Sequence, residues 1–161
     1  MGERAPYNVL FVCTGNTCRS PMAEAIARRA LQERGWDHVG VRSAGTSAHQ
    51  GGGVSGGALR VASAAGLALD DHRCRPLSVD MVEWADLILP MSPSHMHEVS
   101  ALGGGDKATL LGSFAPEAQD GAVPAVPDPF GGSDEEYART FERIASMVEE
   151  MLTRLESTIT A

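Results

Sequence analysis

Residues 7–35 read YNVLFVCTGNTCRSPMAEAIARRALQERG, and this stretch decides the fold. Its first part, Tyr7–Val12, is a short apolar run with β-branched and aromatic side chains, which is typical of a buried strand. Small and polar residues follow over Cys13–Ser20. The last part, Pro21–Arg34, carries apolar residues at helical spacing, and Ser20 stands where an N-cap residue is expected. The stretch therefore predicts a strand, a loop and a helix in direct succession.

The remainder of the chain alternates between segments typical of strands and of helices. We expect further strands at 39–44, 85–89 and 107–111, helices at 58–65, 78–84, 92–102 and 133–157, and a long loop over 112–132. This alternation predicts the α/β class: a small three-layer doubly wound fold with a four-stranded parallel sheet and helices on both faces. Ligands of such folds bind beyond the carboxyl ends of the strands, where the first loop is expected to lie.

Length and composition narrow the class of protein. The 161 residues suit one domain over residues 1–161, and a hydrophobic fraction of 43% suffices for one core. The formal net charge of −8 disfavours nucleic acid and an anionic membrane surface as partners. No apolar run approaches the length of a membrane span, and the first residues lack the apolar core of a signal peptide, so we expect a cytoplasmic protein.

Three cysteines, Cys13, Cys18 and Cys74, are the next feature to explain. They are too few and odd in number for a disulfide framework. They also lack the paired short spacings of a structural zinc site, so we expect neither a metal nor a cofactor.

The loop that begins at Cys13 has the composition of an anion-binding site. Gly15 leads towards a helix N-terminus, where backbone N–H groups and the helix dipole favour negative charge, and Arg19 adds a planar fork of donors. These groups favour the thiolate form of Cys13, a nucleophile suited to attack phosphorus. Ser20 is placed to donate a hydrogen bond to that thiolate, and Asn16 tolerates a left-handed backbone from which its amide can hold the loop.

A thiolate that attacks phosphorus needs a partner that protonates the leaving group and then activates water. The best candidate is Asp128, within Val126-Pro-Asp-Pro-Phe130. Its two flanking prolines restrict the backbone, and the long loop that carries it is expected to lie over the strand ends. We therefore expect Asp128 to act as general acid and then as general base.

The segment Val12-Cys-Thr-Gly-Asn-Thr-Cys-Arg-Ser-Pro21 resembles the phosphate loop of low-molecular-weight protein tyrosine phosphatases. Asp128-Pro-Phe130 is similar to the late Asp-Pro-aromatic motif of that family, and Ser43–Thr46, His72 and Ala85–Leu89 also fall where the family has similar segments. The resemblance implies that Cys13 becomes a phosphocysteine, that Arg19 binds the phosphoryl group, and that Asp128 moves the protons.

The resemblance also implies the wider site and the partner. The substrate would be a phosphorylated protein, and the enzyme a monomer or a weak homodimer. Ser43 and His72 would support the loop, although a purely structural role for His72 is equally open. The phosphate-binding residues would be Thr14, Gly15, Asn16, Thr17, Cys18, Arg19 and Ser20.

Two positions bear on the phosphoryl group that is cleaved. Thr17 stands where tyrosine phosphatases usually carry an apolar residue, and Phe130 where tyrosine is frequent. Thr17 together with Asp128-Pro-Phe-Gly-Gly132 resembles the bacterial protein arginine phosphatase branch. Both phosphotyrosine and phosphoarginine stay open, with Thr17, His49 and Phe130 expected at the rim that contacts the substrate.

Two other classes of function remain as alternatives. Arsenate reductases resemble this fold but relay electrons through a close downstream cysteine pair, whereas the chain offers only Cys74 downstream. A non-catalytic phosphate-binding module would need neither the thiol of Cys13 nor the carboxyl of Asp128. Cys18 could pair with Cys13 in a reversible disulfide, which makes it a candidate redox residue.

Overall fold

Three parallel strands form the centre of the molecule. The computed structural model describes residues 4–161, so the first three residues of the predicted domain lie outside the described part. The strands are β1 (Tyr7–Cys13), β2 (Val39–Gly45) and β3 (Leu87–Pro90), in the spatial order β2-β1-β3. The helices are α1 (Arg19–Arg34), α2 (Gly56–Ala64), α3 (Val79–Trp84), α4 (Pro93–Ala101), α5 (Asp134–Arg154) and α6 (Glu156–Ile159).

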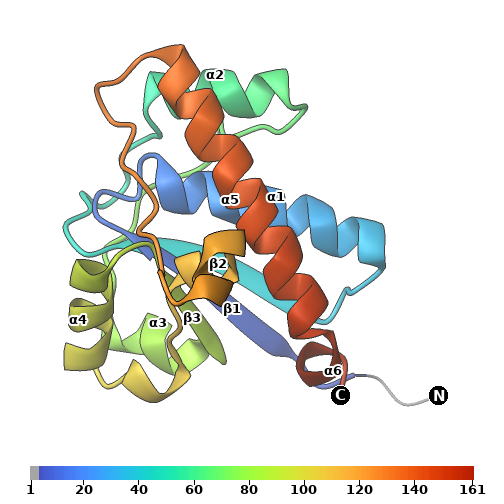
Figure 1. Cartoon of the computed structure of the whole chain (residues 1–161). Helices are drawn as coiled ribbons and strands as arrows, with labels where there is room; N and C mark the ends of the chain where they lie inside the picture. Colours follow the sequence, from blue (N-terminus) through green and yellow to red (C-terminus); the bar gives the residue numbers. More distant parts are fainter. Residues whose placement is uncertain (1–3) are drawn as a thin grey trace.

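Helices cover both faces of the sheet, as the alternation of elements predicts. Phe11 of β1 packs into a cluster with Met22 of α1 and Ile144 of α5, whereas Leu10 packs on the opposite face with Val99 of α4. Successive side chains of a strand point to opposite faces, so β1 contributes to two cores at once. Figure 1 shows α1 and α5 on one side of the sheet and α3 and α4 on the other. The doubly wound, three-layer class is confirmed.

The predicted fourth strand at 107–111 is wrong. Only Ala108 makes an isolated parallel bridge, to Ile88 of β3, next to the hydrogen bond from Thr109 N to Ile88 O at 2.9 Å. The chain then turns into a 3-10 helix at Leu111–Phe114. Gly112 lies against the backbone of Pro124, where a Cβ atom would meet the Pro124 oxygen at 1.8 Å. The chain therefore leaves the sheet edge after one bridge, and the sheet has three strands.

The long segment expected as a loop over 112–132 is partly ordered. It contains most of the 3-10 helix at Leu111–Phe114 and all of a second at Pro116–Asp120. Its later part returns to the sheet, because Val126 N donates to Met91 O at 2.9 Å and the Val126 side chain is buried. This contact brings the Asp-Pro motif back to the carboxyl ends of the strands.

Topology places the ligand-binding edge at the end of β1. Its neighbours β2 and β3 lie on opposite sides, so the order of strands reverses at β1. Such a switch point leaves an open crevice beyond the strand ends. Cys13 is the last residue of β1 and α1 begins at Arg19, so the loop between them lies in that crevice. Within residues 4–161, no helix is both long and apolar enough to cross a membrane.

Candidate active site

Asn16 organises the loop between β1 and α1. It is the only residue other than glycine in the described part of the chain with a positive φ, 56°. Its Nδ2 donates to Ser20 Oγ at 2.8 Å and to Ser43 Oγ at 2.9 Å, and its Oδ1 accepts from the backbone N of Arg75 at 3.0 Å. The left-handed backbone turns the amide inward, where it joins the loop to two other segments of the chain. The predicted inward amide of Asn16 is therefore present.

The thiol of Cys13 lies at the base of this loop. Only 2% of Cys13 is exposed, and its Sγ lies 2.8 Å from Ser20 Oγ. Asn16 already donates to Ser20 Oγ, so the Ser20 hydroxyl acts as a donor, either to the sulfur at 2.8 Å or to Ala44 O at 3.4 Å, and the sulfur is the nearer acceptor. The expectation that Ser20 caps the helix is wrong: α1 begins at Arg19, and Cys18 holds the N-cap position without a side-chain cap. The hydroxyl of Ser20 faces the thiol instead.

Ser43 and Glu24 extend the support of the loop. Ser43 Oγ donates to Glu24 Oε1 at 2.7 Å, and the second carboxylate oxygen of Glu24 lies 3.0 Å from Arg28 Nη1. Glu24 is only 6% exposed, so these partners compensate for burying its charge. The sequence analysis did not single out Glu24. A charged residue on the apolar face of α1 was the available signal.

His72 lies on the outer side of Asn16. Its Nε2 is 3.1 Å from Asn16 O and 3.2 Å from Asn16 Oδ1, so the ring nitrogen donates to these oxygens. Burial lowers the pKa of His72, which favours the neutral ring. The structure thus places Ser43 and His72 in contact with Asn16.

Arg19 and Asp128 meet at the open side of the loop. Arg19 Nη1 donates to Val126 O at 3.1 Å, and Nη2 donates to Thr14 Oγ1 at 3.3 Å. Asp128 Oδ2 lies 3.6 Å from Arg19 Nη2, while the other carboxylate oxygen accepts from Phe130 N at 3.1 Å. The side chain of Asp128 is 51% exposed, against 7% for Arg19. The carboxyl group therefore borders both the buried arginine and solvent.

His95 of α4 belongs to the site, although the sequence analysis did not single it out. It is 2% exposed, with Nε2 2.8 Å from Thr14 Oγ1 and Nδ1 2.9 Å from Ser92 Oγ. Burial, helped by the charge of Arg19, lowers the pKa of His95 to about 4. A neutral ring with hydrogen on Nδ1 completes a chain in which Arg19 donates to Thr14 and Thr14 donates to His95.

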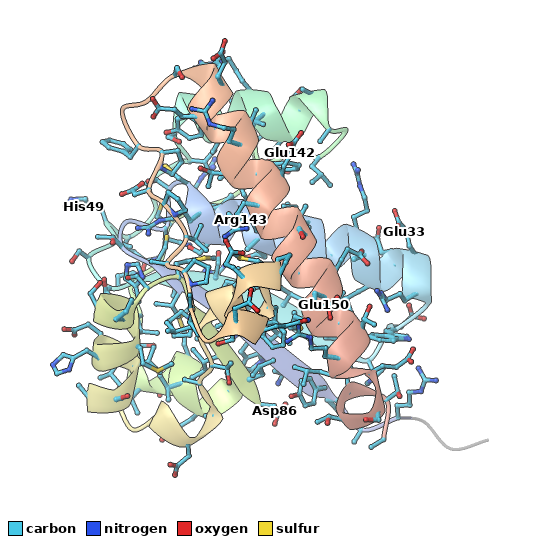
Figure 2. The ribbon with its side chains drawn as sticks, viewed as in Figure 1. Glu33, His49, Asp86, Glu142, Arg143 and Glu150 are labelled. Carbon is cyan, nitrogen blue, oxygen red and sulfur yellow. The ribbon has the colours of Figure 1, made fainter. Side chains whose placement is uncertain are left out.

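These groups surround a pocket of about 360 Å³. The predicted rim residues Thr17, His49 and Phe130 all line it. Phe130 is 69% exposed, and Figure 2 shows the His49 side chain at the edge of the molecule. The full lining is Cys13, Thr14, Gly15, Thr17, Cys18, Arg19, Ser47, His49, Gly52, Cys74, Asp128 and Phe130. The structure therefore brings the predicted nucleophile, arginine, carboxyl group and rim to one cavity.

Cys18 and Cys74 are buried free thiols, as Cys13 is. Cys18 Sγ lies 3.1 Å from Ser55 Oγ and 3.4 Å from Tyr137 Oη, and Tyr137 donates to Ser55 at 3.0 Å. This hydroxyl cluster joins the loop to α2 and α5, and the sequence analysis did not single out Tyr137. Cys74 Sγ donates to Asn16 O at 3.0 Å, and burial raises the pKa of its thiol.

The donor set of the site is that of an oxyanion-binding site. Across residues 4–161, His, Cys, Asp and Glu side chains form no group of three that could hold a metal ion. The cavity instead offers a guanidinium, a loop at a helix N-terminus and a sulfur nucleophile. Fold and site together define an α/β protein with a cysteine-centred site for a tetrahedral oxyanion.

Comparison with known proteins gives the family. The sequence profile of the low molecular weight phosphotyrosine protein phosphatases matches residues 8–161, and the chain belongs to this family. It is 35% identical to a protein-arginine-phosphatase of Bacillus subtilis, covering 92% of this chain and 97% of that protein. It is 36% identical to a low molecular weight protein-tyrosine-phosphatase of Streptomyces coelicolor, covering 92% and 91%.

A solved structure adds a chemical observation. The YwlE arginine phosphatase, in a cysteine-to-serine mutant with a phosphorylated active site serine, superposes with a TM-score of 0.82 at 34% identity. The match covers 92% of this chain and 95% of that one. In that relative, the active-site position therefore carries the phosphoryl group.

Proposed function

We propose that this protein is a phosphoprotein phosphatase that works through a phosphocysteine on Cys13. One observation carries the proposal: Cys13 Sγ lies 2.8 Å from the Ser20 hydroxyl, inside the pocket that Arg19 and Asp128 share. Membership of the phosphatase family and the phosphorylated active-site residue of YwlE support it. A site that only binds phosphate needs no nucleophile and no proton donor beside the anion.

The first step transfers the phosphoryl group to sulfur. The thiolate of Cys13 attacks phosphorus, and the bond from phosphorus to the leaving nitrogen or oxygen breaks. Asp128, in its protonated form, gives its proton to that leaving atom. Arg19 binds two phosphoryl oxygens with its planar fork and stabilises the charge that they carry in the transition state. Val126 O and Thr14 Oγ1 hold the guanidinium for this task.

The second step releases inorganic phosphate. The carboxylate of Asp128 takes a proton from a water molecule, which attacks phosphorus while the bond to sulfur breaks. The sulfur leaves as a thiolate, and the Ser20 hydroxyl stabilises it by donating a hydrogen bond. Each step passes one proton through Asp128, and the enzyme returns to its starting state.

The residues at the rim favour phosphoarginine as the substrate. Thr17 lines the pocket and contributes a hydroxyl group to its wall. A hydroxyl can accept a hydrogen bond from the guanidinium of a phosphoarginine, whereas the phenyl ring of a phosphotyrosine has no N–H or O–H to donate. Protein-arginine-phosphatases stand among the relatives with matching length.

Phosphotyrosine is the second candidate, because Phe130 exposes an aromatic face at the same rim. Such a face can pack against a substrate ring, and the methyl group of Thr17 does not exclude one. The relative from Streptomyces coelicolor carries the tyrosine phosphatase name.

Steady-state kinetics with matched phosphoarginine and phosphotyrosine peptides test the assignment. Thr17→Val removes the hydroxyl at constant shape, and Thr17→Ser keeps it as the control. We expect Thr17→Val to shift the ratio of kcat/KM towards phosphotyrosine by about tenfold, because one lost hydrogen bond has roughly this effect on discrimination. An unchanged ratio would contradict the role of Thr17, and absence of hydrolysis of both peptides would contradict the proposed function.

A cytoplasmic location and a monomeric or weakly dimeric state remain part of this proposal. The candidate redox role of Cys18 also remains a prediction, since Cys18 lines the same pocket as Cys13.

A further inference from the structure

A second concave site lies on the other side of His72 from the phosphate loop. It is a cleft of about 710 Å³ between α1 and the segment 66–75, which lies between α2 and α3 in the chain. Four arginines line it: Arg28 and Arg29 from α1, and Arg73 and Arg75 from the connecting segment. Figure 1 shows the chain after α2 returning along α1. The proposed phosphatase chemistry uses none of these four side chains.

The positive charge of this cleft is not neutralised by its own walls. Its carboxyl groups are Glu24 and Asp71, and Glu24 is buried with Ser43 and Arg28 as partners. Among residues 4–161, neither Arg73 nor Arg75 has a carboxylate oxygen within 4.0 Å. The guanidinium of Arg73 donates to the backbone oxygens of Asp70 and His72.

Arginines elsewhere on the described surface are of two kinds: Arg4, Arg42 and Arg139 form no ion pair, whereas four others do. Arg34, Arg60, Arg143 and Arg154 each form an ion pair with a glutamate or an aspartate. The chain carries 21 acidic residues against 13 basic ones, so a concentration of four arginines in one cleft runs against its overall charge. Local charge of one sign in a concave surface attracts ligands of the opposite sign.

We propose that this cleft binds a small multivalent oxyanion, a molecule with two or more phosphate or carboxylate groups. Guanidinium groups bind such oxygens through paired hydrogen bonds, and those of Arg73 and Arg75 have no carboxylate partner to give up. The cleft has the volume typical of sites for small molecules. Arg28 and Arg29 line the opposite wall, so one ligand with two anionic groups can contact both walls.

The scaffold of the phosphate loop forms part of this cleft. Glu24 accepts from Ser43, Ser43 accepts from Asn16, and His72 donates to Asn16. A ligand in the cleft therefore lies one side chain away from the residues that hold the loop. The binding measurement has to separate the cleft from the Cys13 pocket, because both attract oxyanions.

Calorimetric titration with pyrophosphate tests the proposal, using the full chain with its Cys13 pocket filled by orthovanadate. We expect the wild type to bind one pyrophosphate, and the double variant Arg73→Gln with Arg75→Gln to bind it at least about tenfold more weakly, as expected for the loss of two charged hydrogen bonds. The control is Arg42→Gln with Arg60→Gln, which changes the net charge equally outside the cleft, and we expect it to bind within about twofold of the wild type. Circular dichroism and cooperative urea unfolding of both double variants show whether they fold, without depending on the activity of the Cys13 loop.

A titration with citrate at the same ionic strength distinguishes the sources of the anion. Binding of both ligands assigns the cleft to polyanions in general, and binding of pyrophosphate alone assigns it to phosphates. Absence of pyrophosphate binding to the wild type would overturn the proposal. So would an equal loss of binding in both double variants, because it would reflect net charge alone.

Discussion

The two sides of the active site are built differently. On one side, Cys13 and Asn16 are buried within the loop between β1 and α1, and hydrogen bonds with β2 and with the segment 66–75 hold that loop. On the other side, Asp128 is half exposed on a proline-flanked segment, where it pairs with Arg19 and accepts a hydrogen bond from the nearby Phe130 N. Nucleophile and anion-binding groups are held rigidly, whereas the proton donor borders solvent.

This difference suits the proposed chemistry. Phosphoryl transfer depends on positions of charge and of the attacking atom, and a buried network keeps those positions constant. The proton donor has to meet a leaving group in one step and a water molecule in the next, so it needs access to solvent. Substitutions on the Cys13 side should therefore affect activity and stability together, and substitutions on the Asp128 side should affect activity alone.

The largest effect is expected for Cys13→Ser. Without the thiolate, kcat for an aryl phosphate should fall by about 10⁴-fold or more, because the nucleophile of the first step is lost. Cys74→Ser is the matched control, since its thiol lines the same pocket, and it should retain kcat within about tenfold. Comparable losses in both variants would break the assignment of the nucleophile.

Asp128→Asn should lower kcat by about 10²- to 10³-fold, the range typical of a general acid. Because the side chain is half exposed, the free energy of unfolding should stay within about 0.5 kcal/mol of the wild type. Urea denaturation measures that value alongside the kinetics. Asp134→Asn at the start of α5 is the control, and a similar loss of kcat there would contradict the role of Asp128.

Asn16→Ala tests the buried side of the comparison. It removes a side chain that bonds Ser20, Ser43 and the Arg75 backbone, and it leaves a residue with positive φ without its amide. We expect about 3 kcal/mol of lost stability together with a drop in kcat of about tenfold or more. Asn8→Ala, at the other end of β1, removes a side-chain hydrogen bond to Trp84 O and should cost only about 1 kcal/mol.

The buried His95 predicts a pH dependence of stability. Its folded pKa of about 4 lies below the ordinary value of 6.5, so the unfolded chain binds more protons between these values. Stability should therefore fall as the pH decreases from about 6.5 to 4, by roughly 3 kcal/mol. His95→Gln should flatten this part of the profile, whereas His97→Gln, an exposed neighbour on α4, should leave it unchanged. Equal profiles for all three proteins would contradict a buried neutral His95.

The smallest effect is expected for Phe130→Ala. The ring is mostly exposed, so stability should not change measurably, whereas kcat/KM for an aryl phosphate should fall by about threefold to tenfold through lost packing. Val123→Ala, another exposed apolar residue, is the control and should leave both values unchanged. A loss of stability on Phe130→Ala would show that the rim is part of the core.

The sequence predicts the parts of the molecule that form from local patterns better than the parts that depend on distant contacts. The strand, loop and helix at residues 7–35 form local structure from local patterns, so their order and the position of Cys13 were predictable. The fourth strand was not, because the turn at Gly112 depends on contact with Pro124, far along the chain. Ser20 has the residue type of an N-cap, but tertiary contacts with Cys13 and Asn16 determine its role.

Two residues that contact the loop over long sequence separations, His95 and Tyr137, escaped the sequence analysis. His95 reaches Thr14 across 81 positions, and Tyr137 reaches Cys18 across 119. Neither belongs to a local motif, and Tyr137 also fits the apolar face of α5. A charged or polar residue at an apolar position of a helix is a pattern that could have marked Glu24 and His95 as functional residues.

The central claim is that Cys13 carries the phosphoryl group during turnover. Mass spectrometry of the Asp128→Asn variant, acid-quenched during hydrolysis of an aryl phosphate, tests it most directly, because loss of the base slows the second step. We predict a peptide that contains Cys13 and is heavier by one phosphoryl group, and no phosphorylated peptide from the double variant Cys13→Ala with Asp128→Asn, because alanine offers no atom that could accept the phosphoryl group. A phosphoryl group on another residue of the variant, or hydrolysis without any phosphorylated peptide, would contradict it.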